Sequence, residues 1–381
     1  MGEWGRRLAM IFAAALAGYA AMSVGMPLPW MIGPLLLTCS FGMLDIKPPL
    51  HKTYRPVGQL VVATAVGLYF TPEAFAEVTE QAVEMVGAAI LTIGAGLTSA
   101  LLLRRLAKVD GTVAFFAAMP GGPVEMAVLA ERWGAPGAPV IFSQTMRIVF
   151  IVLVIPPALM FFAGISMPTL RPTTEIYLPG LALLYAIAII CTYLLHLANV
   201  PNRNFLGPLA VGALISVLGI KLSGVPTVLL AAGQILLGIS LGSTFTRRQF
   251  RRDVGFARAA VITTVILLLQ CAVVAVGLWL ISDKPLGGFL LATAPGSVTE
   301  MALTAKLLNQ GVAMVTAYHL VRIFIIIPLA PLLYRLFRYF MGTYMEPDQL
   351  EGDATEYGAA SGSHLQPSTK PTSKVEKDPI E

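Results

Sequence analysis

Charged residues are scarce in this sequence of 381 residues, and their scarcity excludes most kinds of soluble protein. Only 12% of the residues are charged, whereas 56% are hydrophobic. A soluble domain has about twice that share of charge, so much of the apolar surface here needs lipid to cover it. Several apolar stretches approach or exceed the ~18 residues that cross a bilayer. The composition therefore predicts a polytopic membrane protein.

Cysteine and histidine are also rare, which argues against disulfides and metal sites. The cysteines lie inside apolar runs, where plain thiols are expected: Cys39, Cys191 and Cys271. The histidines lack the spacing of metal ligands: His51, His196, His319 and His364. We therefore expect no metal, no cofactor and no enzymatic activity. The one strong basic cluster, 247–252, is a short link without a recognition-helix module, so we expect no direct binding of nucleic acid.

Twelve apolar segments follow one another along the chain. They cover about 8–26, 28–44, 56–71, 82–103, 112–133 and 138–163 in the first half, and about 176–198, 204–220, 225–245, 256–282, 286–308 and 312–336 in the second. The first segment resembles a signal peptide, but we expect it to remain as a span because the second half has a matching one. Residues 341–381 are rich in Glu, Ser, Thr, Lys and Pro, and we expect a disordered tail.

The sequence matches itself when it is shifted by 175 residues. Between 114–156 and 289–331, thirteen of 43 positions are identical without a gap. The matches include rare residues inside membrane segments: Glu125 with Glu300, and Arg147 with Arg322. Apolar similarity alone does not align rare charges, so the sequence contains an internal duplication.

The distribution of basic residues predicts that the two halves lie in opposite orientations. Acidic residues follow the third span of the first half, at 73–80, whereas arginines follow its counterpart, at 247–252. The bias reverses after the fourth spans, at 104–108 and 283–284. Because Lys and Arg favour the cytoplasmic side, the halves are predicted to be inverted, which needs an odd number of crossings per half.

The predicted fold is an all-α polytopic membrane protein with two inverted repeats, 1–165 and 166–340. Each repeat has five transmembrane helices and one broken helix, about ten spans in all, and the N-terminus and the tail 341–381 are cytoplasmic. The broken helices are the segments 112–133 and 286–308, whose arms of about ten residues are too short to cross alone. Their tips need protein or a water-filled cavity around them, so we expect the tips to meet near the midplane.

Four ionisable residues lie within the repeated membrane segments: Glu125, Glu300, Arg147 and Arg322. Each Glu falls in the first turn after a broken-helix tip, where the helix dipole favours a carboxylate. Each Arg lies about ten residues into its span, hence ~14 Å deep in a core of ~30 Å. A charge at that depth costs several kcal/mol unless it is paired or solvated. These residues therefore indicate a functional site or a buried ion pair.

Two interpretations of these charges remain open. In the functional one, Arg147 and Arg322 attract an anionic group at the repeat interface, and Glu125 or Glu300 holds a coupling proton or a cation. In the structural one, each Glu forms a static ion pair with the Arg of its own half, which locks the hairpin to the next helix. The two interpretations are compatible with each other.

Residues around the tips complete the predicted substrate site. Gln144 and His319 each precede an Arg by three residues and lie on nearly the same helix face. His319 could titrate near neutral pH, although a hydrogen-bonded neutral histidine is the usual alternative. The other candidates are residues that permit a tight turn or could donate a hydrogen bond: Gly121, Gly122, Gly296 and Ser297.

The tip sequences resemble the bacterial AbrB-like membrane protein family, whose defining feature is a duplicated membrane domain. They read Met119-Pro-Gly-Gly-Pro-Val-Glu-Met126 and Ala294-Pro-Gly-Ser-Val-Thr-Glu-Met301, with Ser297 in place of Gly122. The resemblance covers about residues 8–340. It implies the labels that members carry, ammonia monooxygenase and regulator of gene expression. The first label needs a metal held by several ligands, which this sequence does not offer.

These features predict a secondary transporter of a small anionic solute in the inner (plasma) membrane of a bacterium. It would work by alternating access, with a proton as the expected coupling ion. The alternative is a membrane sensor or regulatory protein that affects gene expression indirectly. The expected partners are the solute and the lipid bilayer, and a homodimer remains open. Inverted repeats with broken helices are also similar to proton antiporters, a likeness of fold that assigns no function.

Overall fold

The computed structural model describes residues 2–46, 48, 51, 53–163, 176–247 and 254–342. Every regular element in those ranges is a helix, and there are fifteen of them. Three features of the sequence lie outside the described residues: the boundary at 165/166, the arginines within 248–252 and the tail from 343 onward. Residues up to Pro331 belong to one compact unit, and residues 332–342 are described only as the end of the last helix.

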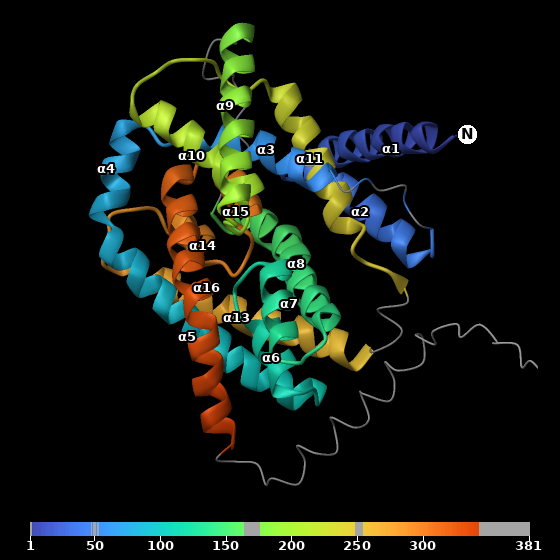
Figure 1. Ribbon diagram of the computed structural model, residues 1–381, viewed down its shortest axis with the longest axis vertical. Coiled ribbons are helices and arrows are strands. Elements are labelled where there is room, and N and C mark those ends of the chain that lie inside the picture. The colour runs from blue at the N-terminus through green and yellow to red at the C-terminus, as the bar shows by residue number, and fades with distance from the viewer. Residues whose placement is uncertain are drawn as a thin grey trace, which may run out of the picture. The chain divides into compact units, whose positions relative to one another are not determined.

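Figure 1 shows the helices, coloured from blue at the N-terminus to red at the C-terminus. The first half contributes α1 (Glu3–Ser23), α2 (Pro29–Met43), α3 (Tyr54–Gly67), α4 (Pro72–Glu80), α5 (Ala82–Ala107), α6 (Gly111–Ala118), α7 (Pro123–Arg132) and α8 (Gly137–Ala163). The second half contributes α9 (Leu178–Leu197), α10 (Arg203–Val217), α11 (Thr227–Gly242), α13 (Val254–Leu280), α14 (Leu286–Thr293), α15 (Val298–Leu307) and α16 (Val312–Gly342). The last helix extends two residues into the predicted tail.

Five helices are long and apolar enough to cross a membrane: α5, α8, α9, α13 and α16. Helices α3 and α4 together pass the same criteria, with a bend of 89° between them. Helices α2, α10 and α11 are apolar but have only 15 or 16 residues, about 23 Å at 1.5 Å per residue, which is less than a ~30 Å core. The protein therefore has the helices of a multi-pass membrane protein.

Both predicted breaks are confirmed. Helix α6 ends at Ala118 and α7 begins at Pro123, which is its first helical residue. Proline is favoured at that position because its missing N–H would have no partner in the first turn. The second break lies between Thr293 and Val298. Each tip is thus a short extended link between two half-helices of eight and ten residues.

The helices pack as two bundles, and each bundle takes equivalent helices from both halves. In the first, which we call the glycine-packed bundle, α2 packs on α11 and α3 packs on α10, and α1 and α9 are added at α2 and α10. The second, the broken-helix bundle, comprises α5 to α8, α13 to α15 and residues 312–331 of α16. Here α5 packs on α13, α6 and α7 pack on α8, and α14 packs on α13. The interleaving explains why residues 1–331 form one unit.

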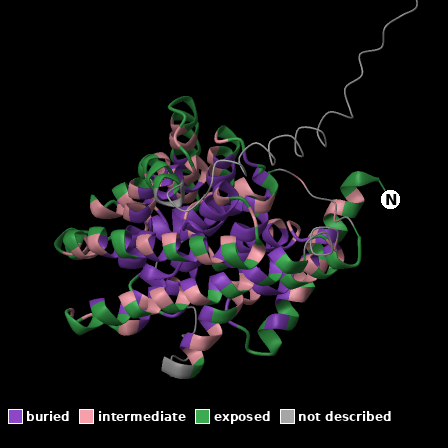
Figure 2. Cartoon of the chain, turned by 90° about the horizontal axis from the view of Figure 1, so that it is seen from below, coloured by how far each residue is buried: buried purple, intermediate pink, exposed green. Residues whose placement is uncertain are grey.

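Buried residues concentrate where these helices meet, and exposed residues line the outward helix faces (Figure 2). Large apolar side chains are among the exposed ones, such as Leu8 and Phe12 on α1 and Leu194 on α9. An exposed apolar helix face is costly in water but suits a lipid environment. The exposure pattern therefore agrees with the composition of the chain.

Candidate functional site

Arg147 on α8 binds the end of the first half-helix. Its Nη1 donates to the carbonyl oxygen of Ala118 at 2.8 Å, and its Nη2 donates to that of Met119 at 3.2 Å. The side chain is only 3% exposed. The last carbonyls of a helix lack partners within it and carry negative partial charge. The guanidinium therefore acts as a buried cap on the C-terminal end of α6.

Arg322 on α16 repeats this arrangement in the second half. Its Nη1 donates to the carbonyl oxygen of Ala294 at 2.8 Å and more weakly to that of Thr293 at 3.5 Å, and its Nη2 donates to that of Gly296 at 3.1 Å. The side chain is also 3% exposed. Each buried arginine thus holds the tip of the broken helix in its own half.

Gln144 and His319 each link an arginine to the backbone of a half-helix, the first through an amide and the second through an imidazole ring. Gln144 accepts a hydrogen bond from Arg147 Nη2 through Oε1 and donates through Nε2 to the carbonyl oxygens of Phe116 and Met119, both at 2.8 Å. Each side chain is fully buried. The amide therefore couples the guanidinium to the half-helix that it caps.

His319 lies between Arg322 and the backbone in the same way. Its Nδ1 is 2.7 Å from Arg322 Nη2, and its Nε2 is 3.0 Å from the carbonyl oxygen of Leu291. Because an arginine can only donate, Nδ1 must accept and Nε2 must carry the proton. The contacts fit the neutral tautomer, and a second proton on Nδ1 would break the contact with Arg322.

Both arginines lie in the interior of the broken-helix bundle. They are close enough to interact electrostatically with each other, and Cys271 on α13 is close enough to interact with both. The Nε of each arginine is buried and has no hydrogen-bond partner. Among the described residues, ion pairs join Arg7 to Glu3, Arg247 to Asp45 and Lys284 to Glu77. No carboxylate in the described chain pairs with Arg147 or Arg322, so backbone carbonyls hold both cations.

Glu125 and Glu300 occupy equivalent positions in α7 and α15 but differ in environment. Glu125 is half-buried, and its carboxylate lies over Gly122, where an added Cβ would be 2.0 Å from Oε2. Ser297 has a Cβ at the equivalent position, which excludes that conformation in the second tip. Glu300 is only 6% exposed, and its Oε2 has no hydrogen-bond partner. A buried carboxylate oxygen without a partner is costly, so Glu300 is the more unusual of the two.

The glycines at the tips permit methionines to pack closely on them. A Cβ at Gly121 would lie 2.5 Å from Met126 Cε, and one at Gly296 would lie 3.1 Å from Met301 Cγ. Ser297 begins α15 without capping it through its side chain. The predicted tip residues are therefore placed together with the arginines, whose side chains donate to the carbonyl oxygens of Met119 and Gly296.

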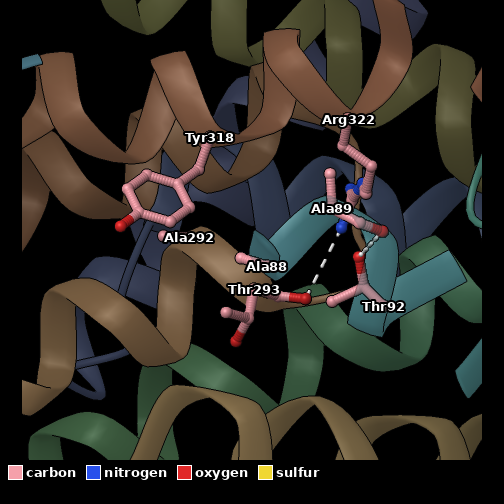
Figure 3. Close-up of a pocket in the computed structure, with 7 residues that line it drawn as sticks. All are labelled: Ala88, Ala89, Thr92, Ala292, Thr293, Tyr318 and Arg322. Atoms are coloured by element: carbon pink, nitrogen blue, oxygen red, sulfur yellow. Dashed lines mark hydrogen bonds between the residues drawn. The ribbon is translucent and has the colours of Figure 1, made fainter. Parts of the chain in front are cut away.

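A small recess reaches Arg322 from one side (Figure 3). It is lined by Ala88, Ala89, Thr92, Ala292, Thr293, Tyr318 and Arg322 and has no room for a water-sized sphere. Ligand pockets usually have about 300–1,000 Å³, so the recess does not hold an organic solute in this conformation. Nothing in the sequence marks α5 as part of this recess, because its alanines and threonine carry no chemical signal. In the described residues no group of His, Cys, Asp or Glu could hold a metal ion.

Comparisons with known proteins give one consistent result. A sequence model of the family described as "Transition state regulatory protein AbrB" matches residues 3–338. "Uncharacterized protein YhjN" of Bacillus subtilis (strain 168) is 24% identical over 354 residues, which cover 86% of this chain and 92% of that protein. "Putative regulator AbrB" of Escherichia coli (strain K12) is 21% identical over 345 residues, which cover 90% and 97%. The similarity thus extends through both halves.

Proposed function

The chain belongs to the AbrB family, as the tip motifs predicted, and we propose that it is a secondary transporter of a small anionic solute. It would work by alternating access, without a cofactor or an enzymatic step, in the inner membrane of a bacterium with both termini cytoplasmic. The expected partners are the solute and the surrounding lipid, and the homodimer remains an open alternative.

The observation that carries the proposal is the pair of buried arginines without carboxylate partners. Arg147 and Arg322 interact electrostatically, and each has an unpartnered Nε. Two neighbouring cations in a membrane protein are costly unless an opposite charge compensates them. Helix C-terminal ends compensate part of the charge, at about −0.5 per helix. An anion held between the two guanidiniums would compensate the rest, and the N-termini of α7 and α15 favour the same sign of charge.

The re-entrant topology is part of the proposal. Lys284 precedes α14 and pairs with Glu77 of α4 at 3.1 Å, and Tyr318, near the start of α16, interacts with Glu84 of α5. The chain thus starts α14 and leaves α15 at the same end of the bundle. Phe142, near the start of α8, packs on Phe256, near the start of α13. These contacts support one hairpin from each side of the membrane.

The two bundles supply the moving parts. The contacts between them run from α15 to α3 and from α8 to α11, and through α4, which packs on both α5 and α10. We infer that the broken-helix bundle, with both tips, moves against the glycine-packed bundle. Coupling to a proton is assigned to Glu300 ahead of Glu125, because the Glu300 carboxylate is buried with an unpartnered oxygen.

The test is solute flux in proteoliposomes. A ligand-stabilisation screen of small carboxylates, phosphates and sulfonates first selects candidates, and uptake of the selected anions is then measured. We expect wild-type protein to transport an anion and R147K and R322K to transport it at least about tenfold more slowly, since Lys keeps the charge but lacks the planar fork. Full transport by both variants would contradict an arginine-based anion site. Unchanged proton dependence in E300Q and E125Q would remove the coupling role.

The rival function is a membrane sensor that regulates gene expression indirectly. It is favoured by the name of the relative from Escherichia coli, "Putative regulator AbrB". A sensor with the same arginine site would be stabilised by an anion but would not move it across a membrane. Stabilisation without flux would therefore support the sensor.

A further inference from the structure

The exposed face of α5 changes from apolar to basic toward the C-terminal end of the helix. Thr98, Leu101, Arg105 and Lys108 follow one another at intervals of three or four residues, so they share one face of the helix. All four are exposed, and Lys108 ends the helix in a left-handed conformation, with φ at 52°. Two cations therefore lie at one end of a face whose next residues inward are a leucine and a threonine.

The exposed face of α13 changes in the same way toward the N-terminal end of that helix. Arg258, Ile262, Val265 and Leu269 also follow one another at intervals of three or four residues, and all four are exposed. Ile262 lies one turn inward from Arg258, and Val265 and Leu269 continue the apolar face beyond it. Each helix thus presents positive charge at its end and apolar side chains directly inward from that charge.

The two faces adjoin along a seam between α5 and α13. Gln270, the residue after Leu269, donates from Nε2 to Thr98 Oγ1 at 2.9 Å on the exposed side of the contact. Ala95 packs on Leu267 and Cys271 behind this hydrogen bond. The two exposed faces are therefore parts of one surface, which we call the α5–α13 surface. Its members are Thr98, Leu101, Arg105, Lys108, Arg258, Ile262, Val265 and Leu269.

The basic ends of the two helices lie at the same end of the α5–α13 surface. An ion pair joins the link after α13 to α4, which precedes α5, so α5 and α13 run antiparallel. Lys108 lies ten residues after Thr98, and Arg258 lies twelve residues before Gln270. At ~1.5 Å per residue these separations are ~15 Å and ~18 Å, about half the thickness of a ~30 Å core. With the Thr98–Gln270 hydrogen bond near the midplane, the cations reach the depth of lipid headgroups.

The cations of this surface have no partner of opposite charge among the described residues. None of the ion pairs found there includes Arg105, Lys108 or Arg258. Asp110, two residues after Lys108, accepts a hydrogen bond from the backbone N–H of Thr112 at 2.8 Å and so caps α6. The three cations are therefore available to a partner outside this chain.

The other end of the α5–α13 surface lacks this positive charge. The residues equivalent to the three cations at the repeat shift of 175 are Leu280, Asp283 and Val83. The repeat would have permitted cations at both ends, so the charge marks one side of the membrane only. It is the side that the bias of Lys and Arg predicts to be cytoplasmic, where the leaflet carries anionic lipids.

We propose that the α5–α13 surface binds an anionic phospholipid such as phosphatidylglycerol, with its phosphate on Arg105, Lys108 and Arg258 and its acyl chains along Leu101 and Ile262. Two features together identify this occupant. Three cations match a headgroup of net negative charge, and the exposed apolar side chains directly inward match acyl chains. A soluble anion would use only the first feature, and a zwitterionic lipid would bring its own cation to the cluster. The inference concerns the membrane and does not depend on the proposed transport.

The test is a titration of the detergent-solubilised protein with phosphatidylglycerol and with phosphatidylcholine of the same acyl chains, followed by native mass spectrometry. The ratio of the two dissociation constants for the first bound lipid measures recognition of the headgroup charge. A basic residue near anionic lipid contributes about fivefold in affinity, so wild-type protein should prefer phosphatidylglycerol on the order of 100-fold. R105Q, K108Q and R258Q should each reduce the preference about fivefold, and the triple variant should lose it. R258K should keep it, because the charge remains.

R6Q is the matched control. Arg6 is exposed on the same predicted side of the membrane, but it lies on α1, which packs on α2 and α11 of the glycine-packed bundle. R6Q should keep the wild-type preference, and the thermal midpoint of each variant verifies that it is folded. Glycerophosphoglycerol, the same headgroup without acyl chains, should not displace phosphatidylglycerol at millimolar concentration.

Four results would overturn the proposal. Equal affinity of the wild type for the two lipids would exclude recognition of charge, and an unchanged preference in the triple variant would place the lipid elsewhere. Displacement by glycerophosphoglycerol would make the cluster a site for soluble phosphodiesters. A dimer that excludes the lipid and is lost in the triple variant would assign the surface to a second copy of the chain. Since lipid binding needs no flux, a failed transport assay leaves the result interpretable.

Discussion

The two bundles are held together by opposite means. In the glycine-packed bundle, helices touch backbone to backbone: a Cβ on Gly238 would lie 2.3 Å from the carbonyl oxygen of Met31, and one on Gly67 would lie 2.5 Å from that of Leu209. In the broken-helix bundle, most glycines meet movable side chains or open space, and Gly96, which meets the ring of Pro120, is an exception. Gly288 faces Met314 Cε, and Gly94 has no neighbour within 4 Å. The polar contacts there include those from Arg147 and Arg322 to backbone carbonyls.

The contrast shows which part of the molecule can rearrange. Close backbone contacts have one geometry, because interiors are tightly packed and tolerate little change in volume. Long guanidinium side chains that hold extended links have alternatives, because the links are not themselves helical. We therefore expect substitutions in the first bundle to affect stability alone, and substitutions in the second to affect both stability and transport.

The largest effect is expected where a buried cap is removed. R147M leaves the carbonyl oxygen of Ala118 and the amide oxygen of Gln144 without their donor, whereas the carbonyl oxygen of Met119 keeps the hydrogen bond from Gln144 Nε2. Each unsatisfied buried group costs about 1–3 kcal/mol, so the loss of stability should be about 4 kcal/mol. Thermal unfolding in detergent measures it. R7Q is the control. Arg7 pairs with Glu3 and lies over the Trp4 ring, 5.5 Å from its centroid, and each such surface contact is worth at most about 1 kcal/mol. Equal effects would show that Arg147 is not a structural cap.

A smaller effect is expected from overpacking the glycine-packed bundle. G238A places a methyl group against the backbone oxygen of Met31, which no side-chain rotation relieves. Such strain costs about 2–3 kcal/mol. G94A on α5 meets nothing and should stabilise the helix by about 0.5–1 kcal/mol. Unfolding by denaturant in mixed micelles measures both. If the two variants shift the transition in the same direction, the backbone contact is not close.

A third test replaces His319, which links Arg322 to the backbone carbonyl of Leu291. H319Q should cost less than about 1 kcal/mol, because Gln144 already makes the equivalent contacts in the other half. H319L removes an acceptor and a donor and should cost about 2 kcal/mol. Melting midpoints compare them. A similar loss in both variants would mean that His319 needs its ring, and a pH-dependent transport change in H319Q alone would make it a proton carrier.

The smallest effect is expected at the surface. E77Q removes the exposed pair with Lys284, which bridges α4 to the link before α14. Exposed ion pairs contribute about 0.2–1 kcal/mol and weaken with salt. The shift in unfolding midpoint should therefore be small and should vanish in high salt. A large, salt-independent shift would place this contact among the buried ones.

The sequence predicted the features that repeat and the residues that are rare. The breaks at Pro120 and Pro295 could be located because proline and glycine interrupt an apolar run, and the arginines because a membrane segment seldom contains one. The partners of Arg147 and Arg322 could not be predicted. Carbonyl groups are present at every residue, so their use as ligands leaves no mark on the sequence, and the expected pairing with Glu125 and Glu300 is not the contact that forms.

Other features escaped for a similar reason. Glu84 lies directly after the acidic stretch 73–80 and resembles part of a solvated link. Only the fold shows it beside Tyr318, which is 234 positions away along the chain. The division into two bundles was also hidden, because self-similarity divides a chain into halves, whereas packing sorts helices by their place within each half. The predicted number of membrane crossings stays a prediction.

The pairing of α2 with α11 and of α3 with α10 has a consequence for the origin of this protein. Each pair joins one half to the other, so a polypeptide with a single half would leave its most closely packed faces uncovered. Only a second molecule of the same kind could cover them. An ancestor of half the length would accordingly have needed a partner of its own kind, and a duplicated and fused gene would supply that partner within one chain.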